Sequence, residues 1–405
     1  MEQIALRNWN VGVWLLPLLG CVAPAPPPGA SVSAPAVPAS LPPASGSVTA
    51  ALPVLRVGTS GDYTPFSTRG ADGVVRGFDA QLAEELAHDL GMRIEWSAFR
   101  WPTLQAQMEA GQFDVAMSGV TWQPTRGVVG YMSRAVAWGG PCVLGDPAAR
   151  RVAVNRGGVL EAWAHDKLSD RDIVTVDDNQ SLPGLLSSAS VGAIVTDSFE
   201  RHVFERPGWA VTCWPPLARK VYWVAPARAR ELGPRIDAWL RDNSSRVQAA
   251  QEQWFGERQR LDAVSALVDL LARRLAFMPL VGRLKQQQGL PVEDRARERA
   301  VLDKAVSAAR QAGLPEQPVH ELFALQIALS KAVERRKGEN STLDLTTQIR
   351  PALTELGDRI ILALQEARES KQLEHCTLGE LEPLSPWLEL AERERLLERL
   401  QAVGR

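Results

Sequence analysis

Leu55-Arg56-Val57-Gly58-Thr59 opens the regular part of this chain of 405 residues and predicts a β-strand. A polar loop containing Gly61-Asp62-Tyr63 follows, and apolar residues at helical spacing predict a helix from Phe78 to Leu90, which Gly91 ends. Further strand and helix patterns alternate at 93–97, 104–109, 113–117, 151–154 and 192–195. This alternation predicts an α/β domain with mostly parallel sheets, whose ligands bind beyond the carboxyl ends of the strands.

The composition excludes several classes of function. The 45 basic and 47 acidic residues leave a net charge of -2, so the chain has no basic field that would hold a nucleic-acid backbone. Five His and four Cys show no CxxC, HxxxH or HExxH spacing, which gives a metal site no support. We therefore expect neither a nucleic-acid partner nor a metal or other cofactor.

The first fifty residues predict an export signal and a tether. An apolar stretch of ten residues, Val11 to Gly20, is too short to span about 30 Å of hydrocarbon but fits the core of a secretory signal. Leu18-Leu19-Gly20-Cys21 resembles a bacterial lipobox, whose cleavage leaves Cys21 as a lipidated N-terminus. The alternative is a simple signal peptide cut near Ala50. Residues 22–53 are almost entirely Ala, Pro, Ser, Gly and Val and predict an extended linker. We expect a periplasmic protein with a lipid anchor at Cys21 after a signal at 1–21.

Export changes the interpretation of the remaining cysteines. An oxidising compartment permits Cys142 and Cys213 to form a disulfide, although two separately buried thiols are the alternative. Cys376 has no obvious partner in its own segment.

Residues 54–256 resemble a periplasmic solute-binding protein of the polar amino-acid class. The resemblance rests on GDYTPF at 61–66, GFDAQLAEELA from Gly77, FDVAMSGVT from Phe113, Arg126, and GAIVTDSFE from Gly192. It implies two α/β lobes that close on a small ligand, with Arg126 binding a carboxylate through two parallel hydrogen bonds. A surface arginine is the alternative. The other ligand contacts that the resemblance implies are Asp62, Ser118, Thr121, Asn155 and Asp197.

Three segments within this region are similar to cyclohexadienyl dehydratases: Arg100 to Leu104, Val154 to Glu161, and Arg219 to Tyr222. These enzymes convert prephenate to phenylpyruvate and arogenate to phenylalanine. The resemblance implies that Glu161 is the general acid, because hydroxide leaves only if it is protonated as it departs, and a desolvated carboxyl keeps its proton near neutral pH. A first-turn Glu that complements the helix dipole is the alternative.

Two further residues of this region have open roles. Trp101 belongs either to the cleft wall or to the core, and Lys220 is either a second anion contact or a surface charge on a hinge strand. The segment Ala137 to Pro141 lacks the lysine often found there in dehydratases, so the second carboxylate anchor is open.

After Trp254 the strand patterns cease. Long amphipathic patterns at 261–284, 295–312, 318–336 and 349–369 predict an all-helical domain over 258–405. Arg274 and Lys285 are eleven residues apart, about three helical turns, so both face the same side. The tail from Glu374 predicts one or two helices of unassigned role.

Residues 258–370 resemble an exported all-helical chorismate mutase. The matching segments are Arg273-Arg274, Val281 to Lys285, Pro291 to Arg299, Leu322-Phe323, and Ser330 to Glu334. The resemblance implies that chorismate rearranges to prephenate without a cofactor, while Arg274 and Arg359 hold its two carboxylates and Lys285 donates to the breaking ether oxygen. Arg350 and Arg368 are the alternatives to Arg359. The remaining implied site residues are Asp294, Arg297, Ser330 and Glu334.

The product of the helical domain is the substrate of the α/β domain. The sequence therefore predicts an exported bifunctional enzyme that takes chorismate through prephenate to phenylpyruvate. The alternative is a non-catalytic receptor for an amino acid or aromatic acid, fused to an active mutase. A homodimer formed through the mutase helices follows by analogy only.

Overall fold

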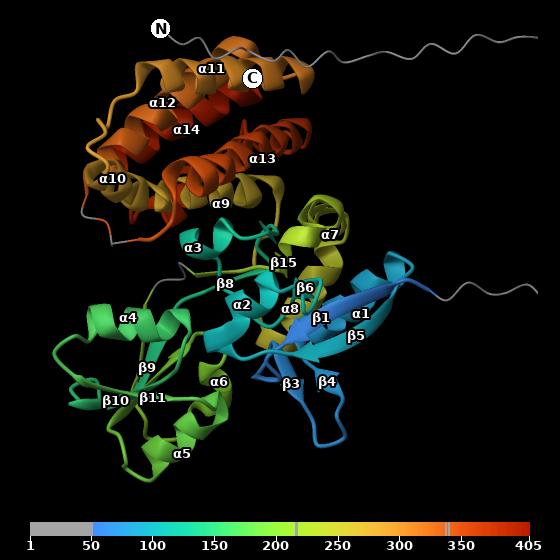
Figure 1. Cartoon of the computed structure of the whole chain (residues 1–405), viewed down its shortest axis with the longest axis vertical. Coiled ribbons are helices and arrows are strands. Elements are labelled where there is room, and N and C mark those ends of the chain that lie inside the picture. Colours follow the sequence, from blue (N-terminus) through green and yellow to red (C-terminus); the bar gives the residue numbers. More distant parts are fainter. Residues whose placement is uncertain (1–51, 215–217, 337, 339–340) are drawn as a thin grey trace, which may run out of the picture. The chain divides into compact units, whose positions relative to one another are not determined.

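The computed structural model describes residues 52–214, 218–336, 338 and 341–405 (Figure 1). The predicted signal peptide, the lipidation site at Cys21 and nearly all of the linker lie outside the described residues. Within the described ranges, no helix has both the length and the apolar character needed to cross a bilayer.

The first lobe is built on a sheet with the strand order β5-β1-β6-β15-β7. Strand β1 pairs in parallel with β5 and β6, whereas β15 pairs antiparallel with β6 and β7. The strands are β1 (Val54–Thr59), β5 (Arg93–Ala98), β6 (Val115–Ala116), β7 (Tyr131–Met132) and β15 (Trp223–Val224). The helices of this lobe are α1 (Phe78–Asp89), α2 (Leu104–Glu109), α3 (Pro124–Gly127), α7 (Ala229–Asp242) and α8 (Ser244–Phe255). A small sheet of β2 (Asp62–Tyr63), β3 (Ser67–Arg69) and β4 (Val75–Arg76) lies between β1 and α1 in the chain.

The second lobe has a sheet with the strand order β11-β10-β12-β9-β13. Strand β10 pairs in parallel with β11 and β12, and β9 pairs antiparallel with β12 and β13. The strands are β9 (Pro141–Gly145), β10 (Arg151–Asn155), β11 (Asp172–Val176), β12 (Ala193–Asp197) and β13 (Val211–Cys213). The helices are α4 (Val159–Lys167), α5 (Leu182–Ser187) and α6 (Arg201–Phe204). The predicted α/β class is confirmed, but parallel pairing is limited to three strands in each sheet.

One feature connects the two lobes, and another cross-links two strands within the second lobe. The chain passes between them through β8 (Ala137–Gly139) and β14 (Ala218–Lys220), which pair antiparallel. Cys142 and Cys213 face each other on β9 and β13 and form a disulfide. The structure therefore contains the disulfide that the sequence left as one of two alternatives. Cys376 is a free, buried thiol.

The C-terminal part of the chain is helical, as the sequence predicted. Its main helices are α9 (Ala263–Ala276), α10 (Met278–Gln287), α11 (Arg295–Gln311), α12 (Glu316–Glu334), α13 (Arg350–Glu369) and α14 (Leu390–Gly404). The predicted helix at 261–284 is interrupted between α9 and α10. Pro279 lies in the first turn of α10 and has no backbone N–H to continue the hydrogen-bond ladder of α9.

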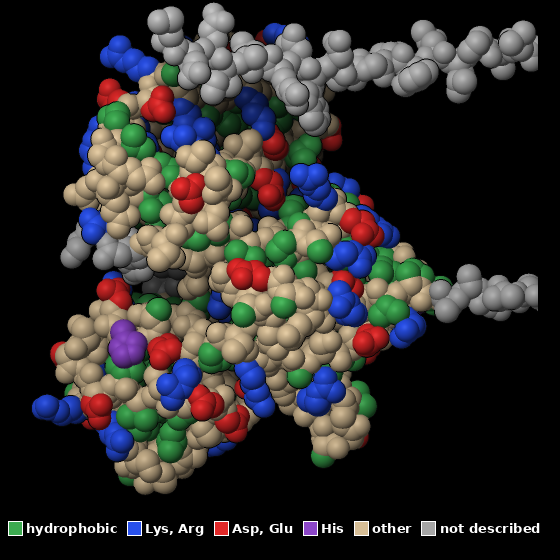
Figure 2. Space-filling view, viewed as in Figure 1, with side chains coloured by type: hydrophobic (Ala, Val, Ile, Leu, Met, Phe, Trp, Pro, Cys, Tyr) green, Lys and Arg blue, Asp and Glu red, His purple; other side chains and the backbone are tan. Residues whose placement is uncertain are grey.

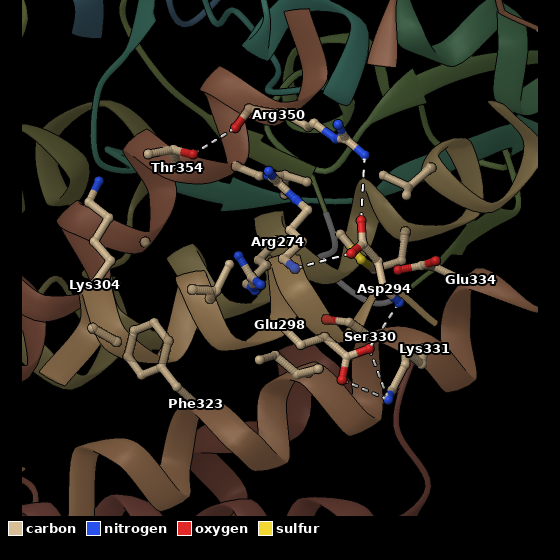
Figure 3. Close-up of a pocket in the computed structure, with 18 of the residues that line it drawn as sticks. Arg274, Asp294, Glu298, Lys304, Phe323, Ser330, Lys331, Glu334, Arg350 and Thr354 are labelled. Carbon is tan, nitrogen blue, oxygen red and sulfur yellow. Dashed lines mark hydrogen bonds and ion pairs between the residues drawn. The ribbon is translucent and has the colours of Figure 1, made fainter. Parts of the chain in front are cut away.

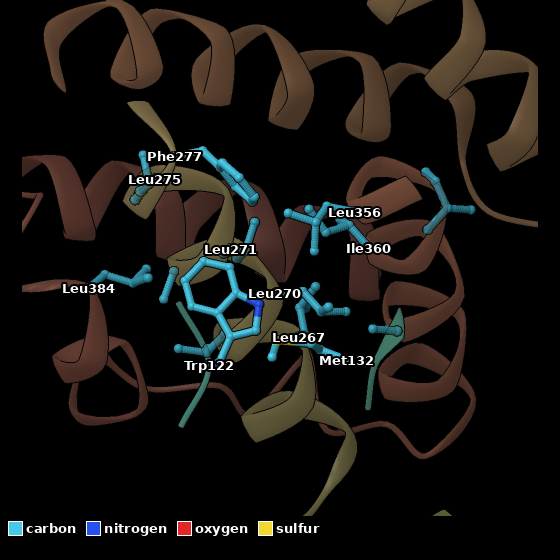
Figure 4. Close-up of a cluster of buried hydrophobic side chains, with 14 of the residues drawn as sticks. Trp122, Met132, Leu267, Leu270, Leu271, Leu275, Phe277, Leu356, Ile360 and Leu384 are labelled. Atoms are coloured by element: carbon cyan, nitrogen blue, oxygen red, sulfur yellow. The ribbon is translucent and has the colours of Figure 1, made fainter. Parts of the chain in front are cut away.

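The α/β and helical parts share one hydrophobic core. Trp122 and Met132 of the first lobe pack among apolar side chains of α9, the α9–α10 junction and α13 (Figure 4). The Trp122 and Phe277 rings meet edge to face with centroids 5.7 Å apart. A continuous apolar core of this kind stabilises the two parts as one body, because separating them would expose these side chains to water.

Candidate active sites

The first cavity of interest lies between the two lobes and has a volume of about 410 Å³. Asn155 and Asp197 are the last residues of β10 and β12, two neighbouring parallel strands, so their side chains reach the same edge of the sheet. Lys220 is the last residue of β14 and forms a bridge with Thr121. The predicted residues that line this cleft are Trp101, Thr121, Arg126, Asn155, Asp197 and Lys220.

A buried polar network occupies the centre of the cleft. Lys220 Nζ lies 2.9 Å from Asp197 Oδ2 and donates to the Tyr63 hydroxyl at 2.6 Å. The same hydroxyl donates to Asp197, whose Oδ1 accepts from the backbone N–H groups of Phe199 and Glu200 at 3.0 and 2.9 Å. Lys220 is only 3% exposed, which excludes the alternative of a surface charge.

Arg126 is a buried cation with room for an anion. Its guanidinium is 8% exposed and donates to the Thr121 carbonyl at 3.0 Å, and it lies 5.8 Å from the Trp223 ring. No carboxylate among the described residues forms an ion pair with it. Burial lowers the pKa of Arg126 to about 10, so the group remains charged at neutral pH. The surface alternative is wrong, and the geometry suits carboxylate binding.

Glu161 does not line the cleft. Its Oε2 accepts a hydrogen bond from the Gly157 N–H at 2.6 Å, so the side chain closes the turn before α4. This local use is close to the first-turn alternative, and it corrects the prediction that Glu161 points at a ligand. A backbone N–H within four residues satisfies the carboxylate there.

Glu200 is the cleft carboxyl that the sequence analysis missed. It is 1% exposed, and it accepts hydrogen bonds from Asn179 Nδ2 and, at 2.6 Å, from Thr196 Oγ1. Burial, together with the nearby charge of Asp197, raises the pKa of Glu200 well above its usual range. This environment favours the protonated form of the carboxyl. The signal for Glu200 in the sequence was its position three residues after Asp197, which is the last residue of β12.

Four tryptophans supply most of the apolar wall of the cleft. Trp101, Trp122, Trp163 and Trp214 all line it, and the Trp163 and Trp214 rings meet with centroids 4.7 Å apart. Trp101 also packs edge to face on Tyr63, so it serves both as cleft wall and as a packing partner. Flat aromatic walls of this kind suit a ring-shaped ligand.

Two predicted cleft residues lie outside the cavity. Ser118 is fully buried, and its hydroxyl lies 2.6 Å from that of Ser67 and 2.9 Å from that of Ser60, so it braces the loop after β1. Asp62 is half-buried, which raises the pKa of its carboxyl, and its backbone carbonyl accepts from Gln180 Nε2 at 2.7 Å. Both residues stabilise loops next to the cleft and do not line the cavity.

The second cavity lies among the helices and has a volume of about 130 Å³ (Figure 3). Helices α9 and α10 contribute one cation each, the start of α11 contributes an Asp and an Arg, and α12 contributes a Ser and a Glu one turn apart. The predicted residues that line this pocket are Arg274, Lys285, Asp294, Arg297, Ser330 and Glu334. They come together because each faces the same side of its helix.

The charges of this pocket are partly paired. Lys285 Nζ lies 2.7 Å from Glu334 Oε2 and also donates to the Val292 carbonyl at 2.9 Å. Asp294 caps α11 by accepting from the Arg297 N–H at 3.1 Å. Arg274 is enclosed, and burial, with the nearby Arg297 charge, lowers its pKa to about 10.

Two polar groups of the pocket still have unused hydrogen-bonding capacity. Within the described part of the chain, Arg274 Nε and Ser330 Oγ have no hydrogen-bond partner. A buried polar atom without a partner costs free energy, so both atoms suit contact with a bound anion or hydroxyl.

Arg359 is not part of this pocket, which corrects the prediction. It donates to the Met132 carbonyl at 2.8 Å and pairs with Asp237 of α7 at 3.0 Å, in the contact between the helical and α/β parts. Arg350, one of the two alternatives, lines the pocket as the first residue of α13 and lies 4.0 Å from Asp294. Nine residues are two and a half helical turns, so Arg350 and Arg359 face opposite sides of α13.

Sequence reasoning also missed four charged residues of the pocket. Lys304 lies two turns after Arg297 on α11 and pairs at 2.7 Å with Asp358, which also lines the pocket. Lys331 and Glu298 both line the pocket and pair at 3.1 Å. The seven-residue spacing from Arg297 to Lys304 on one helix face was the available signal for the first of them.

On the face shown in Figure 2, acidic and basic side chains are interspersed over both parts of the molecule.

The chain resembles known proteins along most of its length. The cyclohexadienyl dehydratase of Pseudomonas aeruginosa is 28% identical over 226 residues, which are 51% of this chain and 84% of that protein. The secreted chorismate mutase of Yersinia pestis is 34% identical over 67 residues, 16% of this chain and 36% of that protein. A solved ancestral amino acid-binding protein, described as a precursor of cyclohexadienyl dehydratase, is 27% identical with a TM-score of 0.47, and the match covers 50% of this chain and 95% of that one.

A family model covers still more of the sequence. The model of the bacterial extracellular solute-binding proteins, family 3, matches residues 55–377. This match takes in both lobes and much of the helical part, well over half of the chain. The chain therefore belongs to the bacterial extracellular solute-binding proteins, family 3.

Proposed function

We propose that this chain is a bifunctional enzyme that rearranges chorismate to prephenate in the helical pocket and converts prephenate to phenylpyruvate in the cleft. The observation that carries the proposal is the position of Glu200, a buried carboxyl with a raised pKa, in the same cleft as Arg126, a buried cation without an acidic partner among the described residues. A buried carboxyl with a raised pKa that lines a cleft is a candidate proton donor.

The cleft has the parts that an aromatising elimination requires. Arg126 binds the pyruvyl carboxylate of prephenate, which is retained, and the tryptophan walls hold the ring. As the bond to the ring carboxylate breaks, its electron pair enters the ring and expels the hydroxyl at the opposite carbon. Glu200 transfers its proton to that oxygen, so carbon dioxide and water leave, and the carboxylate then regains a proton from solvent.

The helical pocket has the parts that a pericyclic rearrangement requires. Arg274 and Arg350 come from α9 and α13 and hold the two carboxylates of chorismate in the reactive chair-like geometry. Lys285 donates to the ether oxygen, on which negative charge grows as the C–O bond breaks. Its 2.7 Å ion pair with Glu334 keeps the ammonium in place.

Incubating the purified full chain with prephenate alone tests the cleft, and incubating it with chorismate alone tests both sites. We expect phenylpyruvate from either substrate. Saturable binding of prephenate or an amino acid without phenylpyruvate would favour the receptor alternative for the cleft. If chorismate is consumed in that case, the helical pocket keeps its proposed role.

The proposal extends to location and assembly. Family membership agrees with an exported protein, and we propose a lipid at Cys21 and a homodimer formed through the helical part. Labelling with a radioactive fatty acid in the wild type and in Cys21→Ser tests the anchor. Sedimentation velocity of the purified chain tests the dimer.

A further inference from the structure

The acidic groups of the cleft are fully engaged before any ligand enters. Asp197 Oδ1 accepts from two backbone N–H groups, and Oδ2 accepts from Lys220 Nζ and the Tyr63 hydroxyl. Each carboxylate oxygen thus already has two donors, which exhausts its ordinary capacity. Asp197 has no lone pair left for an ammonium group of a ligand.

Glu200 offers no replacement. Its two oxygens already accept from Asn179 and Thr196, and burial raises the pKa of the group, which disfavours the charged form that would bind an ammonium. The Thr121 carbonyl beside Arg126 already accepts from that guanidinium. An ammonium placed in the centre of the cleft would therefore find occupied acceptors and two neighbouring cations.

The unpaired charge of the cleft points the same way. Lys220 pairs with Asp197 and Lys167 pairs with Asp166 at 2.9 Å, whereas Arg126 forms no ion pair among the described residues. Arg126 is therefore the cation that is left to complement a carboxylate of the ligand. It opposes a ligand group that carries its own positive charge, because like charges in a desolvated site repel strongly.

We propose that the cleft selects 2-oxo acids against the corresponding α-amino acids, so that prephenate is the substrate and arogenate is discriminated against, and that the Lys220–Asp197 pair is the selecting element. The inference rests on the proposed function and names the substrate class of that same site. Lys220 Nζ occupies the side of Asp197 that an α-ammonium would need. A substrate carbonyl oxygen needs only a donor, which Lys220 and Tyr63 can supply.

The test compares kcat/KM for prephenate and for arogenate. In the wild type we expect the prephenate value to be higher by about tenfold or more, because a site rejects a group that it leaves unpaired. Lys220→Met removes the ammonium and frees Asp197 Oδ2, so the prephenate-to-arogenate ratio should fall by about tenfold. Lys220→Arg keeps a cation beside Asp197 and should keep most of the ratio.

Lys167→Met is the matched control. It removes the same charge from the same cleft without changing any partner of Asp197, so it should lower both kcat/KM values together and leave the ratio within about threefold. Equal kcat/KM for the two substrates in the wild type would overturn the inference. An unchanged ratio in an active Lys220→Met variant would overturn the role of Lys220.

A binding comparison separates this inference from the proposed function. Calorimetry with phenylpyruvate and L-phenylalanine, a matched oxo and amino pair, needs no turnover and no active variant. We expect phenylpyruvate to bind the wild type about tenfold or more tightly, and tighter binding of phenylalanine would overturn the inference. If neither prephenate nor arogenate is dehydrated, the proposed reaction fails, and this binding pair still decides the selectivity.

Discussion

The cleft and the helical pocket hold their charges differently. Each site has an enclosed arginine without an ion pair among the described residues, Arg274 in the pocket and Arg126 in the cleft. The sites differ in their buried carboxyl groups. In the pocket, Glu334 pairs with the Lys285 ammonium at 2.7 Å, whereas in the cleft burial and the nearby charge of Asp197 raise the pKa of Glu200 well above its usual range. The two proposed reactions need this difference. A pericyclic rearrangement needs held carboxylates and a cation, whereas loss of hydroxide needs a proton donor.

The comparison also shows how each fold builds a site. The pocket is assembled from residues at regular spacing on packed helices, so each side chain is placed by the helix that carries it. The cleft is assembled from strand ends and loops of two lobes, and Tyr63 meets Asp197 across 134 residues of sequence. A single substitution should therefore affect one site and spare the other, unless it alters the core that both parts share.

The largest expected effect separates the two sites through Glu200. Glu200→Gln keeps the size of the side chain and removes its acidic proton, so kcat for prephenate dehydration should fall by about 10³-fold. Mutase activity on chorismate should stay unchanged, because Glu200 lies in the cleft and not in the pocket. Steady-state assays of both reactions on the same preparation measure this.

Glu161→Gln is the matched control for that variant. Its carboxylate closes the turn before α4, so we expect dehydratase kcat within about threefold of the wild type. A large loss in Glu161→Gln with full activity in Glu200→Gln would reverse the assignment of the acid. The pH profile adds a second check. Because the pKa of Glu200 is raised, wild-type dehydration should decline as pH rises and the acid ionises, and this decline should lie at a higher pH than an exposed carboxyl would give.

The second largest effect concerns the clamp on chorismate. Arg350→Gln should lower mutase kcat/KM by about 10²-fold, because it removes a charged contact to one of the two carboxylates. Turnover of added prephenate should not change. If Arg350→Gln retains full mutase activity, the opposing clamp is another residue, and Lys304 is then the next lining cation to test.

How well the sequence predicts each site depends on how that site is assembled. The pocket residues from Arg274 to Glu334 could be identified because their spacing within helices fixes which face they share. Arg359 could not be placed in the same way. The orientation of α13 depends on how the chain turns through Leu345–Ile349 before the helix starts, and that turn brings Arg350, on the opposite face of α13, into the pocket.

In the cleft, local patterns predicted the strands and the lobes, but they selected Glu161, which does not line the cavity, and not Glu200, which does. Glu161 follows a Gly-Gly turn, a conspicuous local motif, and the backbone of that turn satisfies its carboxylate. Burial, together with the nearby charge of Asp197, raises the pKa of Glu200. The burial depends on tertiary packing, which the periodicity of the sequence does not show.

A smaller effect concerns the ion pair of the pocket. Glu334 Oε2 lies 2.7 Å from Lys285 Nζ, so its carboxylate holds the ammonium that we propose donates to the ether oxygen. Glu334→Gln weakens this contact and should lower mutase kcat/KM by about tenfold, while prephenate dehydration stays unchanged. The measurement is kcat/KM for chorismate and for prephenate on the same preparation, and full mutase activity in this variant would reject the role of Glu334.

The smallest expected effect on activity distinguishes a structural arginine from a catalytic one. Arg359 pairs with Asp237 at 3.0 Å and lies 4.5 Å from the Tyr131 ring, between α13 and the first lobe. Arg359→Gln leaves Asp237 without this cation and should lower the free energy of unfolding by about 3 kcal/mol, measured by chemical denaturation.

In the folded Arg359→Gln protein, mutase kcat/KM should remain within about threefold of the wild type, because the guanidinium points away from the pocket. Arg359→Lys keeps a positive charge near Asp237 and should recover part of the lost stability. A loss of mutase activity of the size expected for Arg350→Gln, without a loss of stability, would return Arg359 to the active site. Arg350 and Arg359 lie on opposite faces of the same helix. The face with Arg350 lines the pocket and the face with Arg359 contacts the first lobe, so we expect the two substitutions to have different effects.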